Sequence, residues 1–338
     1  MMSNTITPRL SILVNNYNYQ RYLGEALESA LAQMNEHDEL IVVDDGSTDD
    51  SLQLLRHYQQ TRGINLIAHR NQGQLKSVRV AIDAAHGDVV VLLDSDDYFL
   101  PGYLERLRDI YSRHTEVDFV FSAAEVGGTS SPGIHAARRA LNAMQLKPGV
   151  VGRTRWSSIL FFEFVGVSTS GVSLRASLAR QIVTLPETLN SRHRISPLTA
   201  WLLRISHTEA SKAGVSADGV IVRAASMLDA TKYYDDRAGF FYRIHGKNKY
   251  ANASRLGRWY LRKNRKQVIV DSAVEHFGLR TRPTARELRE EIAQRQFGIR
   301  LRRRIHMRAL YFLAAMSASG SWREKLAAMA HAAGLARG

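Results

Sequence analysis

The sequence contains no cysteine and no long apolar run. The lack of thiols excludes disulfide bonds, thiolate nucleophiles and cysteine-liganded metals, and it suits a reducing compartment. The longest apolar stretches are too short to span a bilayer: Ala309–Met316 is one, and Ser157–Gly171 is broken by Glu163. The N-terminus has no basic segment followed by an apolar one, so we expect no signal peptide and a cytoplasmic protein.

A glycine-rich phosphate loop is also missing. Neither G-x-G-x-x-G nor the P-loop pattern occurs where a strand would turn into a helix, which disfavours a dinucleotide dehydrogenase and a P-loop kinase. Any phosphate group would therefore be bound mainly by a metal ion and by side chains.

Charge is unevenly distributed. The chain carries a net charge of +14, although its hydrophobic content of 45% and charged content of 23% are ordinary for a globular protein. From Arg255 to Gly338 there are 19 Lys and Arg and 6 Asp and Glu, so nearly all of the excess lies in the last quarter. The first three quarters have the charge balance of an ordinary enzyme.

Strand and helix patterns alternate along the first 123 residues. Apolar runs predict five strands, at Leu10–Val14, Leu40–Val43, Ile64–Ala68, Val89–Leu93 and Phe119–Ala123. Between these strands, apolar residues recur at helical spacing and predict helices around residues 23–31, 52–58, 75–85 and 102–114. Such crossovers imply an α/β fold with an open, mostly parallel sheet flanked by helices.

The rest of the chain is less regular. We expect an irregular insertion over Ala124–Val150 and a loop over Thr184–Ser196. Short strands are expected at Gly171–Leu174 and Gly239–Ile244, and helices at Ala176–Ile182, Leu198–Ile205 and Ala217–Leu228. From Ser254 onward we expect helices with one break near Pro283. We predict three units. Residues 1–124 and residues 125–253 form the two halves of one catalytic domain, and residues 254–338 form a helical extension.

Acidic side chains follow the fourth strand directly. Asp94, Asp96 and Asp97 lie within four residues, where they repel one another unless a divalent cation such as Mg²⁺ or Mn²⁺ binds between them. Alternation along an extended chain would point Asp94 and Asp96 the same way. Ligands of open parallel sheets bind at this edge. The alternative is an acidic turn before a helix that begins at Pro101.

Two further strands end in polar clusters, Asn15–Asn18 and Asp44–Asp50. Tyr17 could stack on a base, and Asp45 could accept hydrogen bonds from a base or ribose. The alternatives are packing for Tyr17 and turn chemistry for Asp44 or Asp45. The three clusters together predict a site for a nucleotide diphosphate.

These segments carry a family resemblance. LSILVNNYNYQRYLGEALESALAQ, ELIVVDDGSTDDS, NQGQ and HGDVVVLLDSDDYFLPGYLE resemble, in order and spacing, the nucleotide-binding half of family-two glycosyltransferases of the A-type fold, from Leu10 to about Ala123. The resemblance implies the nucleotide-diphospho-sugar transferase architecture and transfer of a sugar from a nucleotide diphosphate, usually with inversion. Weaker similarity continues through VSTSGVSLRASLARQI and FYRIHGKN, to about Tyr250.

The resemblance also implies roles for particular residues. Donor contacts fall on Asn15, Tyr17, Asp45, Gly73, Asp94 and Ser95. Ligands for Mn²⁺ or Mg²⁺ fall on Asp94, Asp96 and His245, and the alternative for His245 is a strand-end histidine bonded to the backbone. The catalytic base falls on Asp218, for which an acid at a helix N-terminus is the alternative. The sequence departs from the family pattern at Asn16, where proline is common, and at Ala217, where Glu usually precedes the Asp.

The basic C-terminal quarter matches none of these motifs. Arg300, Arg302, Arg303, Arg304 and Arg308 precede an apolar segment, which suits an anionic membrane surface, nucleic acid, or helices that pack on the catalytic domain with solvated arginines. Membrane contact suits a lipid-linked acceptor.

The leading interpretation is a metal-dependent inverting glycosyltransferase acting on a saccharide or lipid-linked acceptor in surface polysaccharide or glycoconjugate synthesis. The alternatives are a sugar-phosphate nucleotidyltransferase and a non-catalytic basic protein with a degenerate site.

Overall fold

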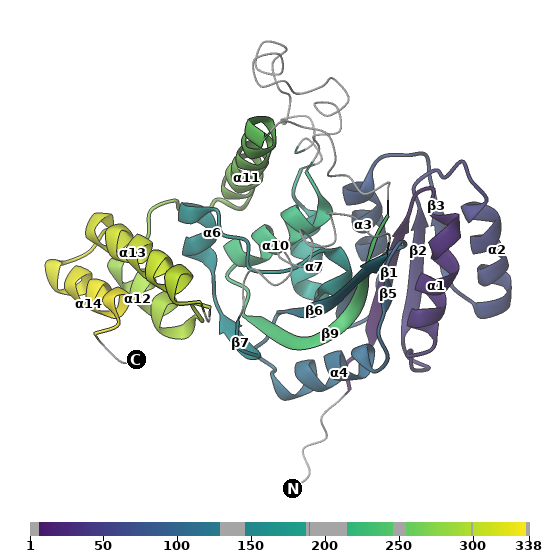
Figure 1. Ribbon diagram of the computed structural model, residues 1–338, viewed down its shortest axis with the longest axis horizontal. Helices are drawn as coiled ribbons and strands as arrows, with labels where there is room; N and C mark the ends of the chain where they lie inside the picture. Colours follow the sequence, from purple (N-terminus) through teal and green to yellow (C-terminus); the bar gives the residue numbers. More distant parts are fainter. Residues whose placement is uncertain are drawn as a thin grey trace, which may run out of the picture.

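The computed structural model describes residues 7–128, 146–186, 189, 215–245, 255–298 and 300–335 (Figure 1). The expected helix at Leu198–Ile205 and most of the expected loop at Thr184–Ser196 lie outside these residues. The described strands are β1 Leu10–Asn16, β2 Glu39–Asp44, β3 Asn65–Ala68, β4 Val89–Asp94, β5 Tyr98–Phe99, β6 Phe119–Gly128, β7 Gly149–Gly152, β8 Val172–Arg175 and β9 Lys232–Ile244.

The described helices alternate with these strands and then follow them. They are α1 Gln20–Leu31, α2 Ser51–Arg62, α3 Gln74–Asp83, α4 Tyr103–Arg113, α6 Arg155–Phe161, α7 Ala176–Val183, α10 Ala217–Met227, α11 Arg255–Phe277, α12 Ala285–Gln294, α13 Leu301–Ser317 and α14 Trp322–Ala333, with a 3₁₀ turn, η1, at Thr169–Gly171.

Nine strands form one sheet within the described residues, in the order β3-β2-β1-β4-β8-β6-β9-β5, with β7 beside β9. Strands β1 to β4 are parallel, and β9 is parallel to β6, whereas β8 runs antiparallel between β4 and β6. The predicted open, mostly parallel sheet is therefore confirmed. Its central apolar runs are fully buried because α1 and α2 pack on one face and α3 on the other.

Several boundaries differ from those predicted. Helix α4 begins at Tyr103, one residue after the expected start at Gly102, because Gly102 has a left-handed backbone with φ +76°. Residues 124–128, expected in an irregular insertion, continue β6, and 149–150 belong to β7; residues 129–145 lie outside the described chain. Strand β9 starts at Lys232 rather than Gly239. The first half of this strand was not predicted because its polar segment Asp235–Arg237 lies at a register shift opposite Ser122–Ala123.

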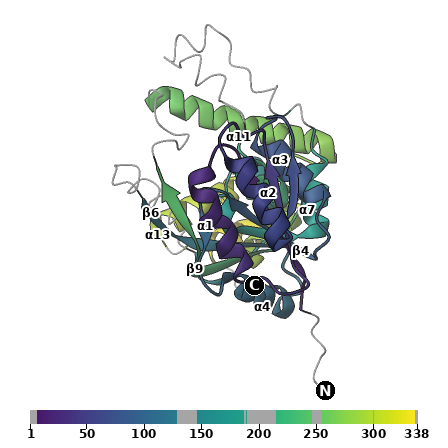
Figure 2. The same ribbon diagram turned by 90° about the vertical axis from the view of Figure 1, so that its right-hand side faces the viewer.

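The C-terminal residues are helical, as predicted, and pack on the helices and strands that precede them. The helical structure is interrupted near Pro283, as expected, and it is also interrupted after α12 and after α13. Helix α11 packs on α10 and crosses one end of the molecule (Figure 2), while α12 packs on α6 and β7. Among the helices described, none combines the length and the hydrophobicity needed to cross a bilayer.

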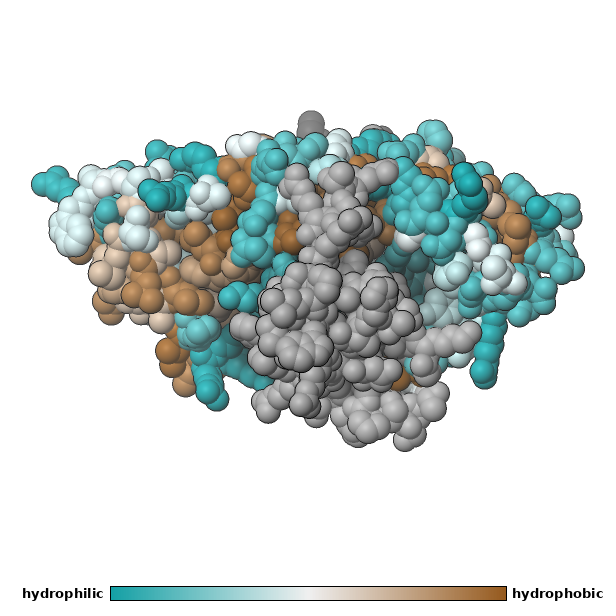
Figure 3. Space-filling view, turned by 90° about the horizontal axis from the view of Figure 1, so that it is seen from above, coloured by the Kyte–Doolittle hydropathy of each residue, from teal (hydrophilic) through white to brown (hydrophobic). Residues whose placement is uncertain are grey.

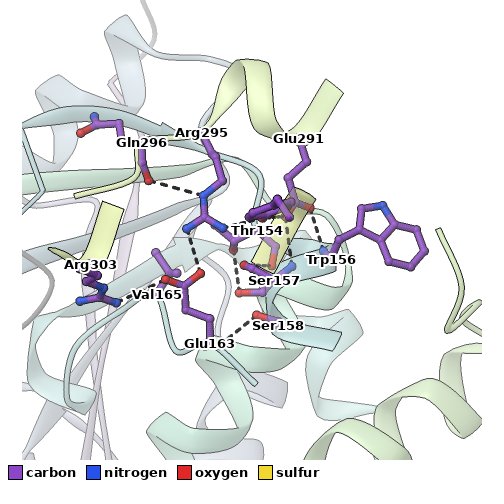
Figure 4. A network of polar contacts seen from close by, with 12 residues as sticks. Thr154, Trp156, Ser157, Ser158, Glu163, Val165, Glu291, Arg295, Gln296 and Arg303 are labelled. Atoms are coloured by element: carbon purple, nitrogen blue, oxygen red, sulfur yellow. Dashed lines mark hydrogen bonds and ion pairs between the residues drawn. The ribbon is translucent and has the colours of Figure 1, made fainter. Parts of the chain in front are cut away.

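A buried ion pair anchors these helices (Figure 4). Arg295 donates to Glu163 Oε2 at 2.8 Å and to the hydroxyl of Tyr311 at 2.6 Å. Glu291 accepts from the backbone N–H groups of Trp156 and Ser157, at 2.7 and 3.1 Å, which satisfies two free donors at the start of α6. The C-terminal helices are therefore bonded through buried side chains to residues 156–163.

Two carboxylates of the anchor make stability depend on pH, and they do so in opposite directions. Burial opposes the ionisation of Glu163, but the charges of Arg295 and Arg303 outweigh it, so the pKa of Glu163 lies below its ordinary value of 4.5. Burial instead raises the pKa of Glu291, and its contribution has the opposite sign.

We expect Glu163→Gln to lower the free energy of unfolding by about 3 kcal/mol at pH 7, because it leaves the Arg295 charge buried without its partner. Since the folded-state pKa of Glu163 is lowered, this difference should be complete above about pH 4.5 and should shrink as pH falls through the folded-state pKa. Urea unfolding at several pH values measures it. Glu28→Gln, which removes the half-exposed pair with Arg62, is the control and should cost less than about 1 kcal/mol. A difference that stays constant below pH 4 would contradict the assignment.

Candidate active site

The carboxyl ends of β1, β2 and β4 meet at one edge of the sheet, as predicted. Asn15 lies opposite Asp94, and Asn16 lies opposite Asp44, in the parallel ladders on either side of β1. The three polar clusters found in the sequence are therefore neighbours in space.

The acidic cluster after β4 is compact. Carboxylate oxygens of Asp94, Asp96 and Asp97 all lie within 4.8 Å of one another. The expectation that strand alternation aligns Asp94 with Asp96 is wrong, because β4 ends at Asp94 and a turn follows, closed by the bond from Asp97 N to Asp94 O at 3.0 Å. The turn, and not the strand, brings the three acids together.

The cluster carries more negative charge than its surroundings compensate. Burial, Asp96 and Asp218 raise the pKa of Asp94 to about 7, although hydrogen bonds from Gln74 and Asn15 lower it. Burial and the two neighbouring carboxylates also raise the pKa of Asp97 well above its ordinary value. Oxygen ligands at this spacing with unmet negative charge fit a divalent cation such as Mg²⁺ or Mn²⁺.

His245 lies against this cluster. Its Nε2 is 2.9 Å from Asp96 Oδ2, and its ring stacks on Tyr22 with the ring centroids 5.2 Å apart. The structure thus brings His245, from the end of β9, to the acids that follow β4. Its role as a metal ligand stays a prediction.

Two residues that the sequence analysis missed fix the acidic turn. Ser170 in η1 donates to Asp97 Oδ2 at 2.6 Å and accepts from Asp94 N at 3.1 Å. Arg243 donates from its backbone N to Asp97 Oδ1 and from Nε to Asp96 O, both at 2.9 Å. The letters FYRIHGKN contain Arg243, but only the pairing of β5 with β9 reveals that it faces this turn.

Asp45 holds the turn that leads into α3. Its two oxygens accept from Gln72 N at 2.7 Å and Gly73 N at 2.9 Å. Gly73 has φ +90°, which disfavours any residue with a Cβ, and it places Gln74 where Nε2 donates to Asp94 Oδ1 at 2.8 Å. Asp45 and Gly73 therefore shape the edge next to the acids, and their contact with a nucleotide stays a prediction.

The first loop is built on a buried amide. Asn16 Nδ2 donates to Asp44 Oδ1 at 2.9 Å and to Ser47 Oγ at 3.1 Å, which gives this departure from the family pattern a structural role. Asp44 also accepts from Ser47 N, so it performs turn chemistry. Tyr17 projects from this loop with 43% of its surface exposed, which leaves its ring available for stacking.

Ser95 and Asp218 complete the predicted set. The Ser95 hydroxyl is buried and has no hydrogen-bond partner within the described chain. Asp218 lies in the first turn of α10, partly buried, where Gly219 N donates to it at 2.8 Å. Its charge acts on Asp94, so α10 brings this acid within electrostatic reach of the cluster.

Comparison with known proteins agrees with this site. Residues 11–166 match the family model described as Glycosyl transferase family 2. These residues are a family 2 glycosyltransferase domain. The glycosyltransferase is 28% identical over 248 residues to an uncharacterized glycosyltransferase of Nostoc sp., which covers 73% of this chain and 68% of that protein. It is 32% identical over 116 residues to chondroitin synthase of Escherichia coli, which covers 34% of this chain and only 17% of that protein.

Solved structures show the same fold. The crystal structure of S. aureus TarS aligns with a TM-score of 0.53 at 17% identity, covering 94% of this chain and 50% of that one. Its fragment 1–349 in complex with UDP-GlcNAc aligns with a TM-score of 0.50 at 17% identity, covering 92% and 82%. The fold of this glycosyltransferase is therefore the A-type architecture that the sequence resemblance implied.

We expect Arg243→Met to weaken Mn²⁺ binding and to lower kcat/KM at least tenfold, because the acidic turn loses the bond to Asp96 O. Mn²⁺ affinity measured by electron paramagnetic resonance, together with kcat/KM, tests this. Arg237→Met is the control, because Arg237 lies on the same strand and its exposed side chain pairs with the buried Asp235. Equal affinities in the two variants would show that Arg243 does not position the turn.

Proposed function

We propose that the protein is a metal-dependent, inverting glycosyltransferase that moves a sugar from a nucleotide diphosphate to a saccharide or lipid-linked acceptor. The observation that carries this proposal is the group of three carboxylates after β4 with unmet negative charge. The family match favours this function over a nucleotidyltransferase and over a non-catalytic basic protein.

The donor would lie along the edge formed by β1, β2 and β4. Tyr17 would stack on the base, and Asn15, Asp45, Gly73 and Ser95 would line the ribose and diphosphate. Asp94 and Asp96, with His245, would hold Mn²⁺ or Mg²⁺. When bound, such an ion neutralises charge on the diphosphate as the sugar departs.

Proton transfer would be the task of Asp218. The acceptor hydroxyl must lose its proton as it attacks the anomeric carbon, and a carboxylate within hydrogen-bond reach can accept that proton. Attack from the side opposite the diphosphate breaks the anomeric C–O bond in the same displacement and inverts the configuration. Asp218 comes from α10, and the donor edge from β1, β2 and β4, so the acceptor would bind between the two halves of the catalytic part.

The acceptor class follows from weaker support. Chondroitin synthase is by its name a polysaccharide-forming enzyme, and this supports a role in surface polysaccharide or glycoconjugate synthesis. A lipid-linked acceptor would place the protein at the inner face of a membrane.

We expect Asp96→Asn to lower the release of nucleoside diphosphate from sugar nucleotide and acceptor by about 100-fold or more, because the variant removes one charge from the ion site. Chromatography of the nucleotide products measures it, and proton NMR of the glycoside reports the anomeric configuration. Asp83→Asn, at the exposed end of α3, is the matched control. Pyrophosphate in place of nucleoside diphosphate, or full activity of Asp96→Asn, would refute the proposal.

We expect Asp218→Asn to lower kcat by about 100- to 10,000-fold while the Kd for the donor changes little, because only proton transfer is lost. Single-turnover kinetics and donor titration separate the two effects. A normal kcat in this variant would show that Asp218 is not the base and would favour the alternative, an acid at a helix N-terminus.

A further inference from the structure

The C-terminal helices α13 and α14 expose an unusual amount of apolar surface. Large hydrophobic side chains that the structure describes as exposed lie, apart from Tyr17, between residues 301 and 335. They are Leu301, Ile305, Leu313, Met316, Trp322, Leu326 and Leu335. Figure 3 shows hydrophobic side chains gathered over this end of the molecule. Contiguous apolar patches on soluble proteins usually mark a binding surface.

The exposed residues follow helical spacing. On α13, Leu301, Ile305, Leu313 and Met316 lie at i, i+4, i+12 and i+15, and on α14, Trp322 and Leu326 lie at i and i+4. The opposite sides are buried, at Met307, Tyr311 and Ala315 of α13 and at Ala328 and Ala332 of α14. Each helix thus packs with one side and presents an apolar stripe with the other; together these stripes are termed the apolar face.

Exposed positive charge lies on the same two helices as the apolar face. Arg302, Arg304 and Arg323 are exposed, and none forms an ion pair with a described residue. From Arg255 to the end, Lys and Arg outnumber Asp and Glu by 19 to 6. A second copy of this surface would be repelled by that charge, whereas an anionic surface would be attracted.

We propose that α13 and α14 dock this glycosyltransferase on an anionic lipid surface, with the apolar face among the acyl chains and the arginines at the headgroups. The proposal deepens the lipid-linked acceptor of the proposed function and rests on it only for its biological purpose. A helix pair with an apolar stripe and flanking arginines lies in the interface plane, where buried apolar area and attraction to anionic lipid add.

The site and the apolar face are compatible with one membrane. Strand β1 rises from the N-terminal end in Figure 1, so the ligand edge lies at the upper end, and Figure 3 looks down on that end with apolar side chains of the C-terminal helices in view. A lipid-linked acceptor held in the membrane could therefore reach the ligand edge while the apolar face is docked on the same membrane.

Vesicle sedimentation of the full chain tests the proposal. We expect binding to vesicles of phosphatidylcholine with about one third phosphatidylglycerol, and little binding to phosphatidylcholine alone. Arg302→Gln with Arg304→Gln should weaken binding about 25-fold, at roughly fivefold for each arginine. Arg56→Gln with Arg113→Gln removes the same charge from exposed positions on α2 and α4 and should change binding less than threefold.

The apolar face has its own test. Leu313→Gln with Trp322→Gln should weaken vesicle binding at least tenfold and leave thermal unfolding unchanged, since 61% and 65% of these residues are exposed. In the wild type, acyl-chain-brominated lipid should quench Trp322 fluorescence, and Trp322→Leu should bind but lose that quenching.

Several results would overturn the proposal. These are no binding to anionic vesicles, unchanged binding by the Leu313/Trp322 variant, tighter binding to a DNA duplex than to vesicles, or a dimer in sedimentation velocity that this variant makes monomeric. Nucleoside diphosphate release with a soluble acceptor is read separately, so loss of transfer without loss of vesicle binding would refute only the proposed function.

Discussion

Mutual repulsion among three carboxylates at the end of β4 is the constraint around which the catalytic part is arranged. Asp94, Asp96 and Asp97 lie within 4.8 Å of one another and are largely removed from water, an arrangement that costs free energy unless partners compensate it. The partners come from every side: Asn15 and Gln74 for Asp94, Ser170 for Asp97, and Arg243 with His245 for the turn that contains Asp96. Burial, together with repulsion between the carboxylates, raises the pKa values of Asp94 and Asp97 in spite of these partners, and a bound cation would oppose that rise.

The partners explain why the second half of the chain folds against the acidic turn. Ser170 and Arg243 follow the acidic turn by more than 70 residues, yet both bond to it directly. They reach it because β8 inserts between β4 and β6 and because β9 pairs with both β6 and β5. A sheet that ended at β4 would present the same acids without the groups that orient them. The order of the strands is thus part of the chemistry of the site.

The sequence predicted those parts of the fold that depend on local periodicity. Strands β1 to β4 and their helices could be located because apolar runs and turn residues alternate, and parallel pairing then placed the polar ends together. The acidic turn was predicted to be extended, since alternation describes strands and not turns. The first half of β9 was missed because Asp235 and Arg237 resemble a loop; Asp235 is buried against Arg106, a partner 129 residues away. Ser170 and Arg243 were missed for the same reason, as their contacts are long-range.

Helices α13 and α14 each have a buried side that packs on the protein and an exposed side that carries apolar residues. Their inner side is fixed by a buried network of hydrogen bonds and an ion pair among Arg295, Glu163, Tyr311 and Glu291. That rigidity makes the outer side available in one fixed arrangement, so the apolar stripes of α13 and α14 need not be ordered by a ligand, and binding costs less conformational entropy. Burying apolar surface contributes about 25 cal/mol per Å², so a few such side chains suffice for reversible adhesion when basic residues flank them. A mobile tail of the same composition would bind more weakly.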